Sequence, residues 1–246
     1  MKKYKFLIFL AIITSLTLLV ITNKKDDTSR VSVVKEEINN KSAEKNLQIN
    51  EILPTSHILR VPYVSEAPEN DWTGKWINAC EEATIAMVEQ YYLGQITVEA
   101  EEAKNILQKL FDEQDKMYGD NKNADASQIQ EIIAKHSSFK AIVKLNPTLE
   151  EIKNEIRDGR PVISLHRGFE LNNKNIPFSP TKSSYHTLVL YGFDDIAREF
   201  ITHDPGDNRE GSGRKYGYDI IMNSLHDYIR ETDTTDGIPT AIFTDK

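Results

Sequence analysis

Residues 185–206 read YHTLVLYGFDDIAREFITHDPG, in which two runs rich in β-branched and aromatic residues flank the polar stretch DDIARE. Two such runs joined by a short polar connection predict a β-hairpin. If the turn is centred on Asp195, His186 lies directly opposite Asp204, with their Cβ atoms about 5 Å apart. A turn displaced by one residue would place the two side chains diagonally or on opposite faces of the sheet. The hairpin therefore predicts that a histidine and a carboxylate come within reach of each other.

The remainder of the C-terminal half also has the pattern of strands. PVISLH at 161–166 precedes the hairpin. AIFTD at 241–245 is the last predicted strand, and it follows one helix predicted from about residue 220 to 229. The N-terminal half has the period of helices. Helices first and strands later predict an α+β fold, in which an N-terminal helical half packs on an antiparallel sheet.

A central helix is predicted to begin near the single cysteine, Cys80. Asn78 followed three residues later by Glu81 predicts a capping box, and apolar residues around most of the circumference indicate that this helix is buried. Three further helices are predicted. The first covers residues 98–117, the second begins after a capping box formed by Asp125 and Gln128, and the third runs from Pro147 to Gly159. Cys80 would then lie in the first turn of the buried helix.

The N-terminus predicts a membrane anchor. Three lysines within the first five residues precede an uncharged, mostly apolar run from Phe6 to Thr22, which is about long enough to span a bilayer. Lysines before such a run stay in the cytoplasm, so the remainder of the chain would face the exterior of a cell membrane crossed once. The alternative is a cleaved signal peptide and a secreted protein, although the end of the run fits a cleavage site poorly.

These segments predict three parts: a transmembrane signal anchor at 1–23, a flexible stalk at 24–55, and a single folded domain at 56–246. The stalk is rich in Lys, Glu, Asn and Ser and has no aromatic residue. The chain has 246 residues and a net charge of -8, which excludes a typical nucleic-acid-binding protein because such proteins need a basic face. One cysteine allows no internal disulfide, so the lone thiol needs another explanation.

Cys80 has the properties of a candidate nucleophile. Unpaired N–H groups and the helix dipole favour a thiolate at a helix start. Glu81 and Glu82 act in the opposite direction, so a nearby base would be required. The alternative is an inert buried side chain, since free cysteine is common in protein cores.

Cysteine on a helix start, then histidine and a carboxylate on a sheet, is the order used in papain-like catalysis. Four blocks carry a closer resemblance: VPYVSEAP at 61–68, ACEEATIAMVEQYY at 79–92, YHTLVLYGFDD at 185–195 and FITHDPG at 200–206. From Ile58 to the C-terminus, the chain resembles stand-alone bacterial domains related to the bacteriocin-processing cysteine peptidases, family thirty-nine of the cysteine class. The resemblance implies a papain-like fold with Cys80, His186 and Asp204 at the triad positions.

One residue departs from that family's pattern at the oxyanion position. The family usually has Gln in the first block, where its amide assists the backbone N–H of the cysteine, whereas this chain has Glu66. An ionised carboxylate would repel the developing oxyanion, and losing one donor typically costs about 100-fold in rate. Either Glu66 is protonated and donates, or another group serves, or the domain hydrolyses poorly. His203 is a lesser departure, where the family usually has Asn.

Each of the other candidate residues or segments has either a functional or a purely structural interpretation. Trp72 and Trp76, in the loop before the cysteine, would line a substrate groove or anchor that loop to the core. The long polar loop before His186 would be a substrate-selecting lid or a plain surface loop. His166, His203 and Asp207 would form a zinc site only if the fold brought them together. The sequence predicts no cofactor and no metal ion.

The resulting hypothesis is an extracellular-facing, membrane-anchored cysteine peptidase that cleaves peptide bonds in a peptide or protein substrate. Two alternatives remain open. The domain is a peptide-binding module that lost turnover with the change to Glu66, or it is a papain-like acyltransferase that passes the acyl group to an amine.

Overall fold

A computed structural model describes residues 54–120, 122–179 and 184–246. The predicted anchor at 1–23, and the predicted stalk up to residue 53, lie outside the described residues. Within the described ranges, no helix has both the length and the apolar character needed to cross a bilayer.

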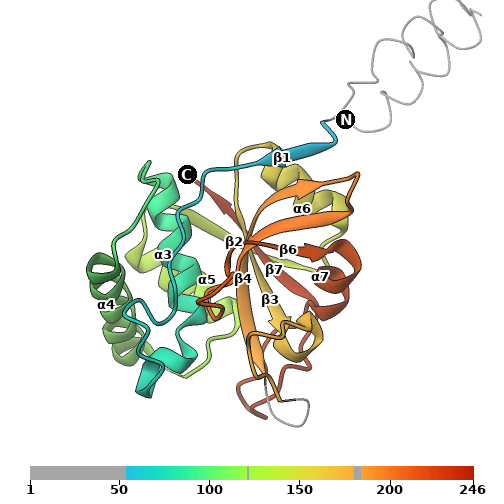
Figure 1. Cartoon of the computed structure of the whole chain (residues 1–246). Coiled ribbons are helices and arrows are strands. Elements are labelled where there is room, and N and C mark those ends of the chain that lie inside the picture. The colour runs from blue at the N-terminus through green and yellow to red at the C-terminus, as the bar shows by residue number, and fades with distance from the viewer. Residues whose placement is uncertain (1–53, 121, 180–183) are drawn as a thin grey trace, which may run out of the picture. The chain divides into compact units, whose positions relative to one another are not determined.

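One antiparallel sheet organises the described residues (Figure 1). Its strand order is β2-β7-β3-β4-β5-β6, and β1 pairs with the far end of β4. The bounds are β1 (Ser56–Ile58), β2 (Lys140–Leu145), β3 (Val162–Arg167), β4 (Tyr185–Asp194), β5 (Glu199–His203), β6 (Ser212–Gly217) and β7 (Thr240–Asp245).

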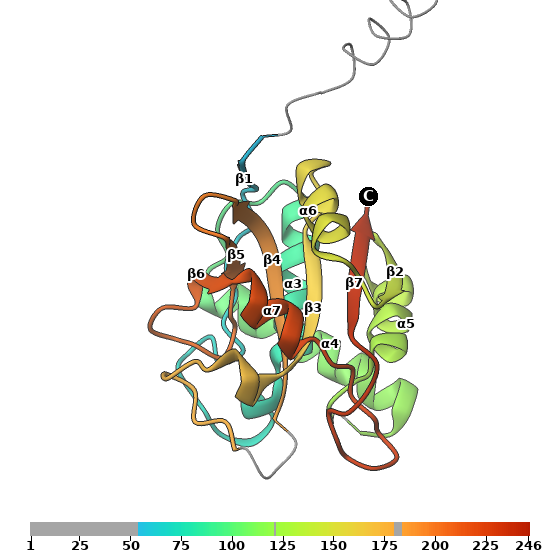
Figure 2. The same cartoon turned by 90° about the vertical axis from the view of Figure 1, so that its right-hand side faces the viewer.

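Helices cover both faces of this sheet, as the two views show (Figure 1, Figure 2). On one face lie α3 (Cys80–Tyr92), α4 (Ala100–Tyr118) and α5 (Ala126–His136), and on the other α6 (Leu149–Arg157) and α7 (Tyr218–Ser224). There are also two short 3-10 helices: η1 (Gly74–Asn78) precedes α3, and η2 (Gly168–Leu171) follows β3. The prediction of an α+β fold with an antiparallel sheet is confirmed.

Successive residues of β4 belong to two hydrophobic cores. Val189 and Tyr191 pack with the apolar residues of α3 to α5, whereas Leu188 and Leu190 pack with those of α6 and α7. Because both faces are covered, β4 is buried along all but its last residue. This explains why the sequence there reads as an almost continuous apolar run.

The helix starts agree with the sequence at α5 and differ at α3. Asp125 and Gln128 form the predicted capping box at the start of α5. The predicted box at α3 is wrong, because Ala79 is the N-cap and Asn78 is the last residue of η1. The side chain of Glu81 instead accepts a hydrogen bond of 2.8 Å from the backbone N–H of Ala124.

The hairpin forms, but its predicted register is wrong. Val189 pairs with His203, which places Asp204 opposite Leu188 rather than His186. His186 and Asp204 are therefore diagonal neighbours, which long side chains can still bridge. The structure also contains β2 and β6, which were not predicted, and the late helix is α7, which ends at Ser224 and not near residue 229.

Candidate active site

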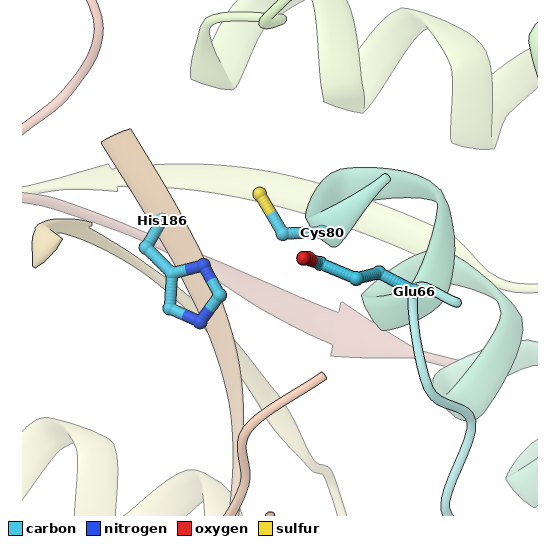
Figure 3. Close-up of side chains that lie close together, drawn as sticks. All are labelled: Glu66, Cys80 and His186. Carbon is cyan, nitrogen blue, oxygen red and sulfur yellow. The ribbon is translucent and has the colours of Figure 1, made fainter. Parts of the chain in front are cut away.

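The beginning of α3 and the beginning of β4 bring the candidate residues together. Cys80 is the first residue of α3 and is 3% exposed. One donor atom each of Glu66, Cys80 and His186 lies within 4.8 Å of the other two. Figure 3 shows the His186 ring beside β4, with one ring nitrogen on the side of Cys80 and Glu66. Side chains that are 14 and 106 residues from Cys80 in the chain thus meet at one point.

The other ring nitrogen of His186 is held by Asp204. Nε2 lies 2.7 Å from Asp204 Oδ1, and both side chains are buried. Asp204 Oδ2 also accepts hydrogen bonds from Tyr216 Oη at 2.6 Å and from Asn173 Nδ2 at 2.9 Å. The carboxylate is therefore fixed on both oxygens, and it leaves Nδ1 of His186 for the thiol.

The two groups favour each other's charged form. Burial acts to raise the pKa of Asp204, but the His186 charge and the hydrogen bonds from His186, Tyr216 and Asn173 lower the pKa below its ordinary value. Burial acts to lower the pKa of His186, and the charge and hydrogen bond of Asp204 raise the pKa above its usual 6.5. An imidazolium at His186 is thus stabilised, as a general base requires after it accepts a proton.

The resting state of the Cys80 thiol differs from the expected thiolate. Sγ donates to Glu81 Oε2 at 2.9 Å. Burial, followed by the charges of Glu81 and Glu66, raises the pKa of Cys80 well above its ordinary value. Only a hydrogen bond with Thr187 acts in the opposite direction, so the thiol is neutral in this geometry.

The carboxyl group of Glu66 is buried and has no hydrogen-bond partner among the described residues. Glu66 is 6% exposed, and burial raises its pKa to about 8, with the His186 charge opposing and that of Asp204 adding to the rise. No donor within the described parts of the chain reaches its carboxyl group. Figure 3 shows this carboxyl directed toward the region between Cys80 and His186. At neutral pH the pKa favours the acid form, which has a proton to donate.

Several contacts fix the segment that carries Glu66. The backbone N–H of Glu66 donates to Pro205 O at 3.1 Å, and Tyr63 Oη donates to Asp207 O at 3.1 Å. His203 Nε2 lies 2.8 Å from Val61 O, while its Nδ1 accepts the N–H of Gly213 at 3.3 Å. Because Nδ1 is an acceptor, the ring is neutral and donates through Nε2. Burial, opposed by the bond to Val61, lowers the pKa of His203 to about 4.

A cavity of ≈ 720 Å³ opens beside these side chains. Apolar residues lining it include Trp72, Ile77 and the loop residues 176–178, and Glu66, Cys80 and His186 also line it. Trp76 is not among the lining residues; its ring packs edge-on against Phe111, with centroids 5.6 Å apart. The structure therefore places Trp72 at the candidate groove, whereas Trp76 is partly buried and packs against the core, where it anchors the loop.

The zinc site considered for His166, His203 and Asp207 does not form. The ring nitrogens of His166 contact Ser164 and Ser224 at 2.7 and 2.8 Å. Asp207 forms an ion pair with Arg214 at 2.6 Å. The three side chains are thus engaged with separate partners.

Sequence reasoning missed the groups that support the histidine. Asn173 and Tyr216 hold Asp204 but lie 31 and 12 residues from it in the chain, and no motif marks them. Gly206 lies against the His186 ring so closely that an added Cβ would be 2.9 Å from Cε1. Only this glycine had a sequence signal, as part of the block FITHDPG.

The family model described as "Peptidase_C39 like family" matches residues 58–233. No curated protein sequence matches the chain. A crystal structure from Bacillus anthracis described as a C39-like peptidase has 17% identity, a TM-score of 0.50, and covers 78% of this chain and 98% of that chain. Xylellain, a cysteine protease from Xylella fastidiosa, has 14% identity and a TM-score of 0.33, over 79% of this chain and 86% of that one. The first of these similarities concerns the fold, and the second is too weak for comparison of folds.

Proposed function

The chain belongs to the C39-like peptidase family, and from this premise we propose that it hydrolyses peptide bonds, with Cys80 as nucleophile, His186 as base and Asp204 as the residue that orients the base. The observation that carries the proposal is the hydrogen bond of 2.7 Å from His186 Nε2 to the buried Asp204. It fixes one ring nitrogen and leaves the other on the side of the thiol.

The reaction begins with a rotation of the thiol from Glu81 toward His186. Nδ1 takes the thiol proton, and the thiolate attacks the peptide carbonyl carbon. His186 then gives that proton to the leaving amine, which separates from the acyl-enzyme. Water, deprotonated by His186, attacks the acyl group and releases the acid and the free thiol. Each step moves one proton through the same ring nitrogen.

In this proposal Glu66 acts in its neutral acid form. A protonated carboxyl donates a hydrogen bond to the oxyanion as an amide would, together with the backbone N–H at the start of α3. Burial of Glu66 and its unfilled hydrogen-bonding capacity among the described residues support this role. The side chain is positioned by the contacts of its segment with Pro205 and His203.

We further propose that the substrate is a peptide or protein met outside the cell, and that the N-terminal segment holds the domain at the membrane. The lysines and apolar run of residues 2–22 support this placement. A peptide-binding module without turnover is the second candidate function. The bond from the thiol to Glu81 favours that candidate, because it withdraws the nucleophile from His186.

The test combines labelling with hydrolysis. The full chain is treated with an electrophilic peptide probe and, separately, with a peptide library. We expect labelling at Cys80 and peptide products, with both lost in Cys80→Ala and labelling strongly reduced in His186→Ala. Glu231→Gln, at an exposed position, is the matched control. Saturable peptide binding without any product in the native chain would contradict the peptidase and support the binding module.

Two substitutions at Glu66 test the proposed donor. Glu66→Gln keeps a donor of similar size, so we expect kcat at neutral pH within about tenfold of the native value. Glu66→Ala removes the donor, and we expect kcat to fall about 100-fold or more. Steady-state kinetics with one cleaved peptide provides both values. Equal activity in Glu66→Ala and the native chain would remove Glu66 from the mechanism.

A further inference from the structure

Buried carboxyl groups gather at the start of α3 without a lysine or arginine partner among the described residues, and His186 is the basic group beside them. Glu66, Glu81 and Glu82 are each buried, and none of them forms an ion pair with a Lys or Arg of the described residues. Glu82 Oε2 and Tyr185 Oη are also buried, and neither has a hydrogen-bond partner within the described ranges. Glu81 accepts hydrogen bonds from Cys80 and Ala124, but buried polar atoms that have no partner, such as Glu82 Oε2, are unfavourable unless a cation or donor balances them.

The three donor atoms of Glu66, Cys80 and His186 already lie near the spacing of a metal site. Zinc binds sulfur at about 2.3 Å and nitrogen or oxygen at about 2.0–2.2 Å, so tetrahedral donors lie roughly 3.5 Å apart. In the structure the three atoms are within 4.8 Å of one another. Closure by roughly 1 Å is small for side chains, and Cys80 can supply part of it by turning away from Glu81.

His186 is also prepared as a ligand. A metal-binding histidine usually donates its second ring N–H to a carboxylate, which fixes the tautomer and the ring orientation. Asp204 accepts from Nε2 in this way and is itself held by Tyr216 and Asn173. Nδ1 is therefore the free ligand atom, on the side of Cys80 and Glu66.

We propose that Glu66, Cys80 and His186 form a binding site for a divalent transition-metal ion of the zinc type, and that the bound ion withholds the thiol from catalysis. A thiolate, an imidazole and a carboxylate suit zinc or cobalt, whereas magnesium and calcium prefer oxygen ligands alone. Three protein ligands leave the fourth position open to the adjoining cavity.

Binding requires no oxidation or reduction. The thiol of Cys80 and the acid form of Glu66 each release a proton to solvent as the ion binds, so both groups bind the metal in their anionic forms. Peptide hydrolysis needs the same sulfur and the same ring nitrogen, so the metal-bound form is inactive until the ion leaves. The proposal goes beyond the peptidase reaction, because the ion would bind whether or not the chain turns over peptides.

The experiment measures binding directly, without any measurement of turnover. The full chain, treated with chelator, is titrated with Co²⁺ and then with Zn²⁺, and a thiolate-to-cobalt absorption band and the equilibrium affinity are recorded. We expect one ion per chain. Glu66→Gln should lower the affinity at least about tenfold, Cys80→Ser should abolish the absorption band, and Glu231→Gln should change neither.

A second measurement guards against misfolded variants. In the native chain, alkylation of Cys80 with iodoacetamide should prevent metal binding, and stoichiometric Zn²⁺ should protect Cys80 from alkylation. The proposal is overturned by the lack of stoichiometric binding, by unchanged affinity in folded Glu66→Gln, or by binding that persists after alkylation. None of these outcomes bears on hydrolysis by the metal-free chain, so failure of this site is distinguishable from failure of the peptidase.

Discussion

The neighbours of the Cys80 thiol include Thr187, and two others, Glu81 and His186, compete for its proton. Glu81 Oε2 accepts its hydrogen bond at 2.9 Å, while His186 Nδ1 lies across the site. Glu81 is itself fixed, because its other oxygen accepts the N–H of Ala124 at 2.8 Å. Catalysis therefore requires the thiol to exchange a stable partner for a reactive one.

The change Glu81→Gln should make Cys80 more reactive. A glutamine still accepts from Ala124 but brings no negative charge, and its amide can donate to a thiolate. Removing a neighbouring charge typically changes a pKa by about one unit or more. At fixed neutral pH we expect alkylation of Cys80 to accelerate about tenfold, measured by mass spectrometry of the intact protein. An unchanged rate, with Glu231→Gln as control, would mean that Glu81 does not restrain the thiol.

At the scale of elements, the turn after β5 positions the catalytic ring. Gly206 N donates to Asp204 Oδ1 at 3.2 Å. A Cβ added to Gly206 would lie 2.9 Å from His186 Cε1 and 3.2 Å from Ile176 Cδ1. The turn thus forms one wall against the ring, and no side chain fits between them.

We expect Gly206→Ala to lower kcat roughly ten- to hundredfold, because displacement of a catalytic group by about 1 Å can cost 10²-fold. The midpoint of thermal unfolding should change little. Gly217→Ala is a matched control, since nothing lies within 4 Å of a Cβ at that position. Equal kcat values for the two variants would show that the ring tolerates the displacement.

The elements that the sequence predicts well are those whose pattern comes from burial. β3, β4 and β7 have apolar runs because helices cover both faces, and the capping box of α5 is a local signal. β2 and β6 lie at the two edges of the sheet, where neither strand is a continuous buried run: β2 begins at the exposed Lys140, and β6 contains Lys215 and two glycines. Their pairing comes from tertiary contacts, which periodicity does not reveal.

The register of the hairpin depends on details that the pattern does not contain. Asp194 Oδ1 accepts from the N–H groups of Ile196 and Ala197, which moves the turn beyond the predicted centre. A β-bulge between Leu190 and Gly192 then changes the pairing by one residue. His186 and Asp204 still meet, because the combined shift leaves them diagonal on one face. Asn173 and Tyr216 could not be predicted, since only the fold brings them to Asp204.

At the scale of the whole molecule, His203 links stability to pH. The ring is 3% exposed, joins β5 to the segment before α3, and stacks on Tyr191 with centroids 4.2 Å apart. No charged group is among the causes that lower its pKa from 6.5 to about 4. Between these values the unfolded chain binds more protons than the folded chain, so the free energy of unfolding falls as the pH falls.

This separation in pKa corresponds to roughly 3 kcal/mol in the free energy of unfolding. That contribution is present in full above pH 6.5 and is lost progressively as the pH falls toward 4. We expect urea unfolding of the full chain to show this loss, in addition to those from other groups. In His203→Asn, the residue usual in the resembled family, the fall in stability between pH 6.5 and 4 should be smaller by about that amount. The same slope in both proteins would show that His203 does not titrate on unfolding.

The attachment of the segment before α3 also has a mechanical consequence. A pulling force on the chain from the N-terminal side first loads β1, which is paired with β4 at only three positions. The next restraints along the chain are the bonds from Leu59 N to Tyr191 O, from His203 to Val61 and from Tyr63 to Asp207, and all three precede Glu66. Tension should therefore break the pairing of β1 with β4 first, while the bonds that follow still hold the segment that carries Glu66. The loss of β1 under tension would thus leave the position of Glu66 in the candidate active site unchanged.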